Sequence, residues 1–164
     1  MLIHFQSCGR HIDDLLTINN NNYMKQVMHL IYPKELILVP DGLNGKQCPF
    51  LDLQLQIKDK IISTSIFDKR DDFDFPIVNF PNLSGNIPTK SAHGVFMGEA
   101  VRYARACTYL HDFKFRLLSL VKKSKMQEFT QKGLRSAWFK FCDSHILLIQ
   151  KYGSEVLDLH NVWM

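Results

Sequence analysis

The sequence lacks the long apolar run that a membrane span requires. No stretch approaches the roughly eighteen consecutive apolar residues of such a span, and the start of the chain carries neither the basic flank nor the cleavage site of a signal peptide. We therefore expect an intracellular protein, located in the nucleus or the cytoplasm, without a membrane partner.

The short motifs of several enzyme classes are also missing. There is no Cys-x-x-Cys and no His-x-x-x-His pair, which argues against a zinc finger and a zinc hydrolase. The phosphate-binding Gly-x-x-x-x-Gly-Lys-Ser/Thr loop and the usual serine and cysteine nucleophile motifs do not occur either. The four cysteines are scattered, which favours reduced, buried thiols. No small-molecule cofactor is evident.

Charge is unevenly distributed along the chain. Residues 1–82 hold 8 Lys+Arg against 10 Asp+Glu, a net of −2, whereas residues 83–164 hold 12 against 6, a net of +6. A basic carboxyl-terminal half favours a polyanionic partner such as nucleic acid. An ordinary solvated helical surface would have the same composition, so charge alone leaves both readings open.

Apolar periodicity predicts an α+β fold in which strands come first and helices follow. Strict alternation of apolar and polar residues at 51–57, followed by an apolar run, predicts an antiparallel hairpin. In chain order, we expect strands at 2–5, 15–18, 36–39, 51–57 and 61–67, with one helix at about 22–31. The later helices are expected at about 93–107, 112–125 and 132–151. The last of these has an apolar stripe of Leu134, Ala137, Trp138, Phe141, His145 and Leu148.

Residues 68–92 differ in kind, because they combine an acidic and basic cluster with three of the six prolines. They predict a long ordered connector. Lys69, Arg70 and the nearby aspartates are expected to neutralise one another, while Phe73, Phe75 and Phe80 anchor the connector to the core. The same aspartates loosely suggest a metal-dependent nuclease, but Lys69 lies beside Arg70 at a strand end, where it does not complete such a site.

The most informative segment is His11-Ile12-Asp13-Asp14, at an expected turn between two apolar strands. Adjacent aspartates are costly unless a positive charge neutralises them. Polymerases that copy nucleic acid use aspartates on such a hairpin to hold two Mg²⁺ ions. A doubled aspartate alone is equally typical of an exposed turn.

An ordered series of blocks accompanies this segment. The series consists of 10–16, 31–36, 50–53, 66–73, 77–81, 102–107 and 132–134. Together they resemble the later part of reverse transcriptases encoded by animal retroelements, close to the Penelope-like group. The resemblance covers about residues 8–152. It implies an RNA-directed DNA polymerase in which Asp13 and Asp14 are catalytic and hold Mg²⁺, with an RNA or DNA template-primer as the partner.

In that family the Tyr-x-Asp-Asp box ends the catalytic palm, and further palm strands and a helical thumb follow it. His11 stands here in place of the tyrosine. The resemblance implies a partial palm at 1–67, a connector at 68–92, a thumb-like helical region at 93–152 and a tail at 153–164. Phosphate contacts would come from the thumb-like helices, through Arg102, Arg105, Lys122, Lys123 and Lys125. Solvated faces and helix capping would account for the same cations.

Only twelve residues precede Asp13. In the family, the nucleotide-binding fingers and the first catalytic aspartate lie in a much longer preceding segment. We therefore expect a fragment of a retroelement-type reverse transcriptase that is inactive alone. The alternative is a non-catalytic nucleic-acid-binding remnant or a module adopted by its host. Partial palm strands would leave leucine and isoleucine side chains of 2–18 and 51–67 partly uncovered, which favours self-association.

The first prediction concerns catalysis. The purified chain should not extend a primer on an RNA template with Mg²⁺ or Mn²⁺, because two aspartates do not supply the coordination of a two-metal site. A primer-extension assay on a denaturing gel measures this. Template-dependent synthesis that disappears in Asp13→Asn would contradict the prediction.

Overall fold

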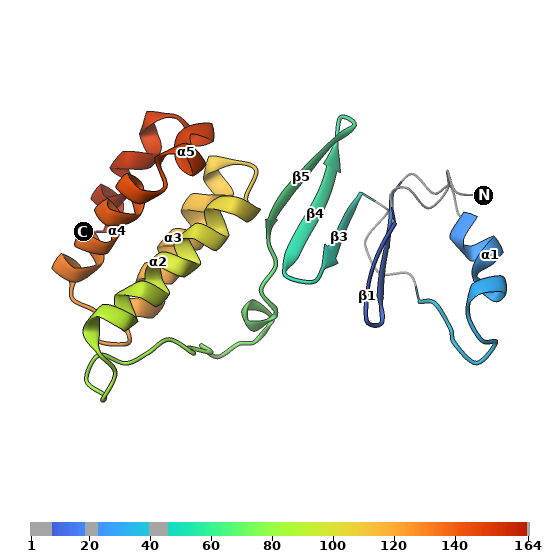
Figure 1. The fold of residues 1–164 in the computed structure, drawn as a ribbon, viewed down its shortest axis with the longest axis horizontal. Helices are drawn as coiled ribbons and strands as arrows, with labels where there is room; N and C mark the ends of the chain where they lie inside the picture. The colour runs from blue at the N-terminus through green and yellow to red at the C-terminus, as the bar shows by residue number, and fades with distance from the viewer. Residues whose placement is uncertain (1–7, 19–22, 40–45, 164) are drawn as a thin grey trace.

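The computed structural model describes residues 8–18, 23–39 and 46–163 and has an α+β architecture. Three parts follow one another along its long axis, as Figure 1 shows: a hairpin with a short helix, then a small sheet, then a bundle of helices. Within the described ranges, no helix combines the length and the apolar character needed to cross a bilayer.

The first part is an antiparallel hairpin of β1 (Cys8–His11) and β2 (Asp14–Thr17), followed by α1 (Tyr23–Ile31). The helix agrees with the one expected at 22–31. The expected strand at 2–5 lies outside the described residues, and the hairpin uses the more polar Cys8–His11 instead. The strand expected at 36–39 is wrong, because no described strand pairs with this segment and it stays irregular and largely exposed.

The second part is a three-stranded antiparallel sheet in the order β3 (Gln47–Phe50), β4 (Leu53–Lys58) and β5 (Ile61–Ile66). The predicted hairpin is confirmed by β4 and β5, whose register pairs Lys58 with Ile61. Sequence periodicity missed β3, which contains Pro49. Proline lacks a backbone N–H, so it is tolerated on an edge strand such as this one.

The sheet joins the helices through the free edge of β5. The backbone N–H of Thr64 donates to Thr108 Oγ1 at 2.8 Å, and the N–H of Thr108 donates to the Thr64 carbonyl at 2.8 Å. Farther along the strand, an Arg116 nitrogen donates to the Ile66 carbonyl at 2.7 Å. These bonds cover backbone groups that an edge strand would otherwise leave open to another chain.

The third part is built on α2 (Thr89–Ala106), α3 (Leu110–Lys125) and α4 (Gln131–Ser144). Their buried residues recur every three or four positions, which places them on one face of each helix. Alanines on α2 face the large side chains of its neighbours, so the helices can approach closely. The largest fully buried side chains include Phe96, Phe113, Leu117, Leu134, Trp138 and Phe141.

The last predicted helix is divided rather than continuous. It ends at His145 and is followed by the short α5 (Ile146–Ile149) and a 3-10 turn, η3 (Gln150–Tyr152). This change of direction brings Tyr152 to the end of α2, where its hydroxyl donates to the Cys107 carbonyl at 2.6 Å. Carbonyls at the end of a helix lack partners within that helix. The Tyr152 hydroxyl supplies such a partner at the end of α2, which a continuous last helix would not do.

Residues 153–164 were expected to be a tail, but the chain continues as the 3-10 segment η4 (Ser154–Trp163). Val156, Leu159 and Trp163 are buried in the same core as the longer helices. Their spacing of three and four residues aligns them on one side of the segment. The core of the bundle therefore extends to Trp163.

Burial is concentrated in the bundle. Among the described residues before Ser63, Met24 alone is buried, whereas Ile61 and Ile62 on the sheet are 61% and 46% exposed. This agrees with the expectation that strand residues stay partly uncovered. The bundle supplies most of the apolar burial that stabilises the fold.

The second prediction tests whether η4 belongs to the core. Leu159→Ala should lower the free energy of unfolding by about 2–5 kcal/mol, because Leu159 is buried and its loss leaves a cavity. Leu157→Ala is the matched control in the same segment and should cost less than about 1 kcal/mol, since Leu157 is 41% exposed. Urea denaturation followed by circular dichroism measures both. Equal costs for the two variants would contradict the assignment.

Candidate nucleic-acid interface

Asp13 and Asp14 lie at the tip of the first hairpin, as the sequence predicted. The register pairs His11 with Asp14, which leaves Ile12 and Asp13 as a two-residue turn. Both aspartates are exposed. The turn holds Ile12 at φ 52°, a left-handed conformation that is unfavourable for a β-branched residue. Arg10 Nε stabilises it by donating to the Ile12 carbonyl at 3.0 Å.

These two carboxylates offer the hard oxygen ligands that Mg²⁺ prefers. Among the described residues, however, no group of three or more Asp, Glu, His and Cys side chains could hold a metal ion. Within the described part of the chain, Asp13 and Asp14 are therefore not joined by a third such side chain.

Three of the five predicted phosphate-binding residues form ion pairs or hydrogen bonds within the protein. Arg102 pairs with Asp52 at 2.9 Å and with Glu99 at 3.1 Å. Lys123 lies 3.8 Å from Asp68 and from Asp71, and Lys125 Nζ donates to the Trp163 carbonyl at 2.8 Å. The remaining two, Arg105 and Lys122, are exposed, and their side chains form no hydrogen bond or ion pair with any residue that the structure describes.

The connector carries its own network of charges. Arg70 binds both carboxylate oxygens of Asp68, at 2.7 Å each, and also reaches Asn79. Arg116 of α3 pairs with Asp71. The expected neutralisation of the loop thus holds for Arg70 and Asp68, while α3 supplies the partners of Asp71.

The expected aromatic anchoring of the connector is only partly correct. Phe80 is partly buried and packs against the core. Phe73 and Phe75 instead are 53% and 55% exposed, and their ring centroids lie 5.4 Å apart. The ion pairs, and not these two rings, fix this stretch to α3.

A groove between α2 and α4 is the basic surface that sequence reasoning missed. It has a volume of about 630 Å³, and no acidic residue lines it among those that the structure describes. We call it the α2–α4 groove; its lining is Thr89, Lys90, His93, Gly94, Met97, Gly133, Ser136, Ala137 and Lys140. The lysines come from two helices fifty positions apart in the sequence, so no local pattern joins them.

Close packing forms the floor of this groove. A Cβ atom on Gly133 would lie 2.5 Å from His93 Nε2, so any larger residue there would require the His93 ring to move. His93 Nδ1–H donates to the Thr89 carbonyl at 2.8 Å, which fixes the ring orientation. The sequence signal was present: on α2, Lys90, Gly94 and Met97 share one helical stripe, with small residues spaced likewise on α4.

The groove is also favourable to anions for an electrostatic reason. Thr89 is the first residue of α2, and Gly133 lies in the first turn of α4, where its N–H donates to Thr130 Oγ1 at 3.1 Å. Helix N-termini carry partial positive charge. Two such ends and two lysines therefore act together along one groove.

Comparisons with known proteins add no relative. No protein-family model matches the chain, and neither the search of curated proteins nor that of solved structures returns a match.

The third prediction concerns the connector network. Asp68 is largely buried, which alone would raise its pKa, but the hydrogen bonds and charge of Arg70 and the charge of Lys123 lower that pKa to about 2 from 3.8. The ionised carboxylate therefore stabilises the fold at neutral pH, and this contribution disappears as the pH falls from about 4 through 2. Asp68→Asn should cost about 2 kcal/mol at pH 7 and remove this acid-dependent component.

Denaturation at a series of pH values measures this effect. Asp158→Asn, an exposed aspartate of η4, is the control and should stay within about 0.5 kcal/mol of the parent. An Asp68→Asn variant whose stability parallels the parent from pH 7 to pH 2 would show that the carboxylate contributes nothing.

Proposed function

We propose that the chain is the palm-and-thumb part of a retroelement-type reverse transcriptase, and that its helical bundle binds the phosphate backbone of an RNA or DNA template-primer. The α2–α4 groove is the observation that carries the binding proposal. Its lysines, hydroxyls and helix ends suit phosphate, and its lining lacks acidic side chains among the described residues. Such contacts position a duplex without reading its sequence.

The α2–α4 groove suits an extended nucleic-acid backbone better than it suits a small molecule. Lys90 and Lys140 flank a floor of glycine and alanine, which lets a backbone approach the helices closely. By contrast, the pocket between the start of α3 and η4 includes Glu155 and Asp158, which would repel phosphate. We therefore propose binding at the α2–α4 groove rather than at this acidic pocket.

The hairpin aspartates support the polymerase part of the proposal. Asp13 and Asp14 present their carboxylates on an exposed turn, as nucleic-acid polymerases do. Bound Mg²⁺ would supply activation of the attacking hydroxyl and stabilisation of the leaving group. We propose that the chain by itself binds without polymerising, which is also the behaviour of the alternative, a host-adopted nucleic-acid-binding module.

The fourth prediction is a salt dependence that maps to the groove. Affinity for a short duplex or hybrid should fall steeply with salt and depend little on base sequence. Lys90→Ala/Lys140→Ala should weaken binding and flatten the log–log salt slope by up to about 1.8 units, since each phosphate contact contributes about 0.9 on B-form DNA. Fluorescence anisotropy across a salt series measures both quantities.

The matched control is Lys58→Ala/Lys114→Ala, which removes the same charge from two exposed lysines outside the groove. It should leave the slope close to that of the parent. Arg105→Ala/Lys122→Ala tests the surface first predicted from the sequence. An unchanged slope in the groove variant would remove the groove from the interface, and no binding by the parent at low salt would overturn the proposed function.

A further inference from the structure

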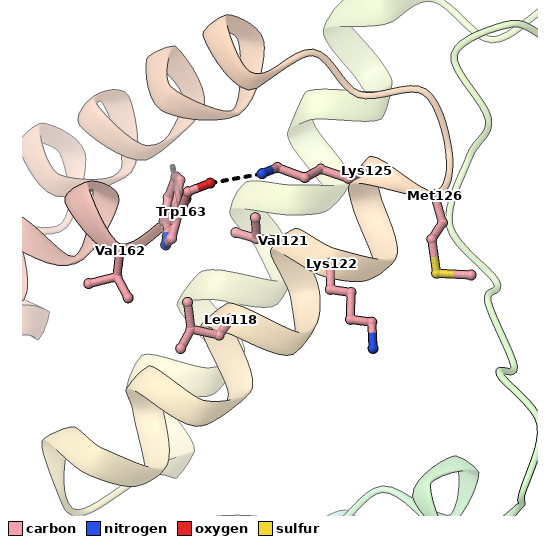
Figure 2. A pocket seen from close by; sticks show the side chains of 7 residues that line it. All are labelled: Leu118, Val121, Lys122, Lys125, Met126, Val162 and Trp163. Carbon is pink, nitrogen blue, oxygen red and sulfur yellow. Dashed lines mark hydrogen bonds between the residues drawn. The ribbon is translucent and has the colours of Figure 1, made fainter.

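A second pocket lies on α3, away from the α2–α4 groove. It has a volume of about 490 Å³ and an apolar wall that includes Leu118, Val121, Val162 and Trp163. Lys122 and Lys125 stand at its rim, and Figure 2 shows Lys122 extending away from the protein while Lys125 reaches the Trp163 carbonyl. The pocket thus combines apolar surface with two positive charges.

Trp163 carries an unused hydrogen-bond donor at this pocket. The residue is 5% exposed, and its indole Nε1 is buried without a hydrogen-bond partner among the described residues. In Figure 2 the indole nitrogen lies on the side of the ring turned toward Leu118 and Val162, two other lining residues. An unsatisfied buried donor is costly, so an occupant that brings an acceptor oxygen would gain a hydrogen bond there.

The chain itself contains a segment with complementary chemistry. In Asp72–Phe75, acidic and aromatic residues alternate. Phe73 and Phe75 are both more than half exposed, and the aspartates between and before them are exposed and have no ion pair with any described residue. Aromatic side chains are enriched in protein–protein interfaces, so two exposed phenylalanines whose ring centroids lie 5.4 Å apart are suited to contact a partner.

This segment is held away from the pocket of its own chain. Arg116 and Lys123 fix the neighbouring Asp71 and lie seven residues apart, on one face of α3. In the pocket, Leu118 lies two residues after Arg116 and Val121 lies two residues before Lys123. Two residues correspond to a rotation of about 200° around an α-helix. The segment and the pocket therefore occupy opposite faces of α3.

We propose that the acidic–aromatic segment Asp72–Phe75 of one copy of this chain docks into the Lys122–Lys125 pocket of a second copy. The aromatic rings cover the apolar wall, the carboxylates meet the two lysines, and a carboxylate or backbone oxygen accepts from the Trp163 indole. Because the segment and the pocket lie on opposite faces of α3, the contact is head-to-tail and continues from copy to copy. This inference does not depend on the proposed nucleic-acid binding.

Sedimentation velocity over a range of protein and salt concentrations tests the proposal. The mean mass of the parent should rise with concentration at low salt and fall as salt screens the charges. Phe73→Ser/Phe75→Ser removes the aromatic rings of the segment, and Lys122→Glu makes the pocket repel the segment's carboxylates. Each variant should weaken association at least tenfold. Ile37→Ser is the control at another apolar side chain, 83% exposed, and should associate like the parent.

Mixing the two defective variants gives the sharpest readout. The segment-defective variant keeps its pocket and the pocket-defective variant keeps its segment, so the mixture should form a 1:1 dimer that cannot grow further. The Trp163 indole N–H resonance should shift in that dimer, in the partner that keeps the pocket.

Three results would overturn the proposal. They are a parent that stays monomeric at every concentration, association that survives both variants, and a mixture that forms no dimer. Loss of association in Ile37→Ser alone would assign the contact to the amino-terminal apolar surface instead. Lys90→Ala/Lys140→Ala should associate like the parent, so failure here and failure of nucleic-acid binding are separate results.

Discussion

The structure depends on the joint between β5 and the bundle. The Thr64 N–H donates to the Thr108 hydroxyl and the Thr64 carbonyl accepts from the Thr108 N–H, while Arg116 binds both the end of β5 and the connector. The sheet has little buried surface of its own, so this joint gives it a rigid base. Because the same arginine and its neighbour Lys123 are committed to the connector, one face of α3 is unavailable to a ligand and the other face carries the pocket.

Close packing of the helices in the bundle forms the proposed binding groove. Small residues allow α2 and α4 to approach, and Gly133 lies against the His93 ring. The same approach aligns the starts of both helices, so that partial positive charge and two lysines line one groove. Close helix packing, which the stability of the bundle requires, thus also determines where this groove and its two lysines lie.

The sequence predicted what local periodicity encodes and failed where distant residues decide. The amphipathic stripe of Leu134, Trp138 and Phe141 identified α4, and strict alternation identified the β4–β5 hairpin. The division at His145 depends on bonds that Tyr152 makes to α2, which no local pattern contains. The groove was missed for the same reason, since its lysines meet only after folding. Arg102 shows the converse: its position on the helix was predicted, but Asp52 and Glu99 occupy its guanidinium.

Hydrogen exchange with and without a short RNA–DNA hybrid is the most direct test of the proposed binding in the α2–α4 groove. Amides at the start of a helix have no acceptor within the helix, so those of 89–91 and 131–132 should exchange quickly in the free protein, whereas Ala92, Gly133 and Leu134 are already hydrogen-bonded. We expect the hybrid to slow exchange at both of these turns and to leave the β4–β5 hairpin unchanged. Protection confined to the sheet, or none at either helix start under conditions where the hybrid is bound, would contradict it.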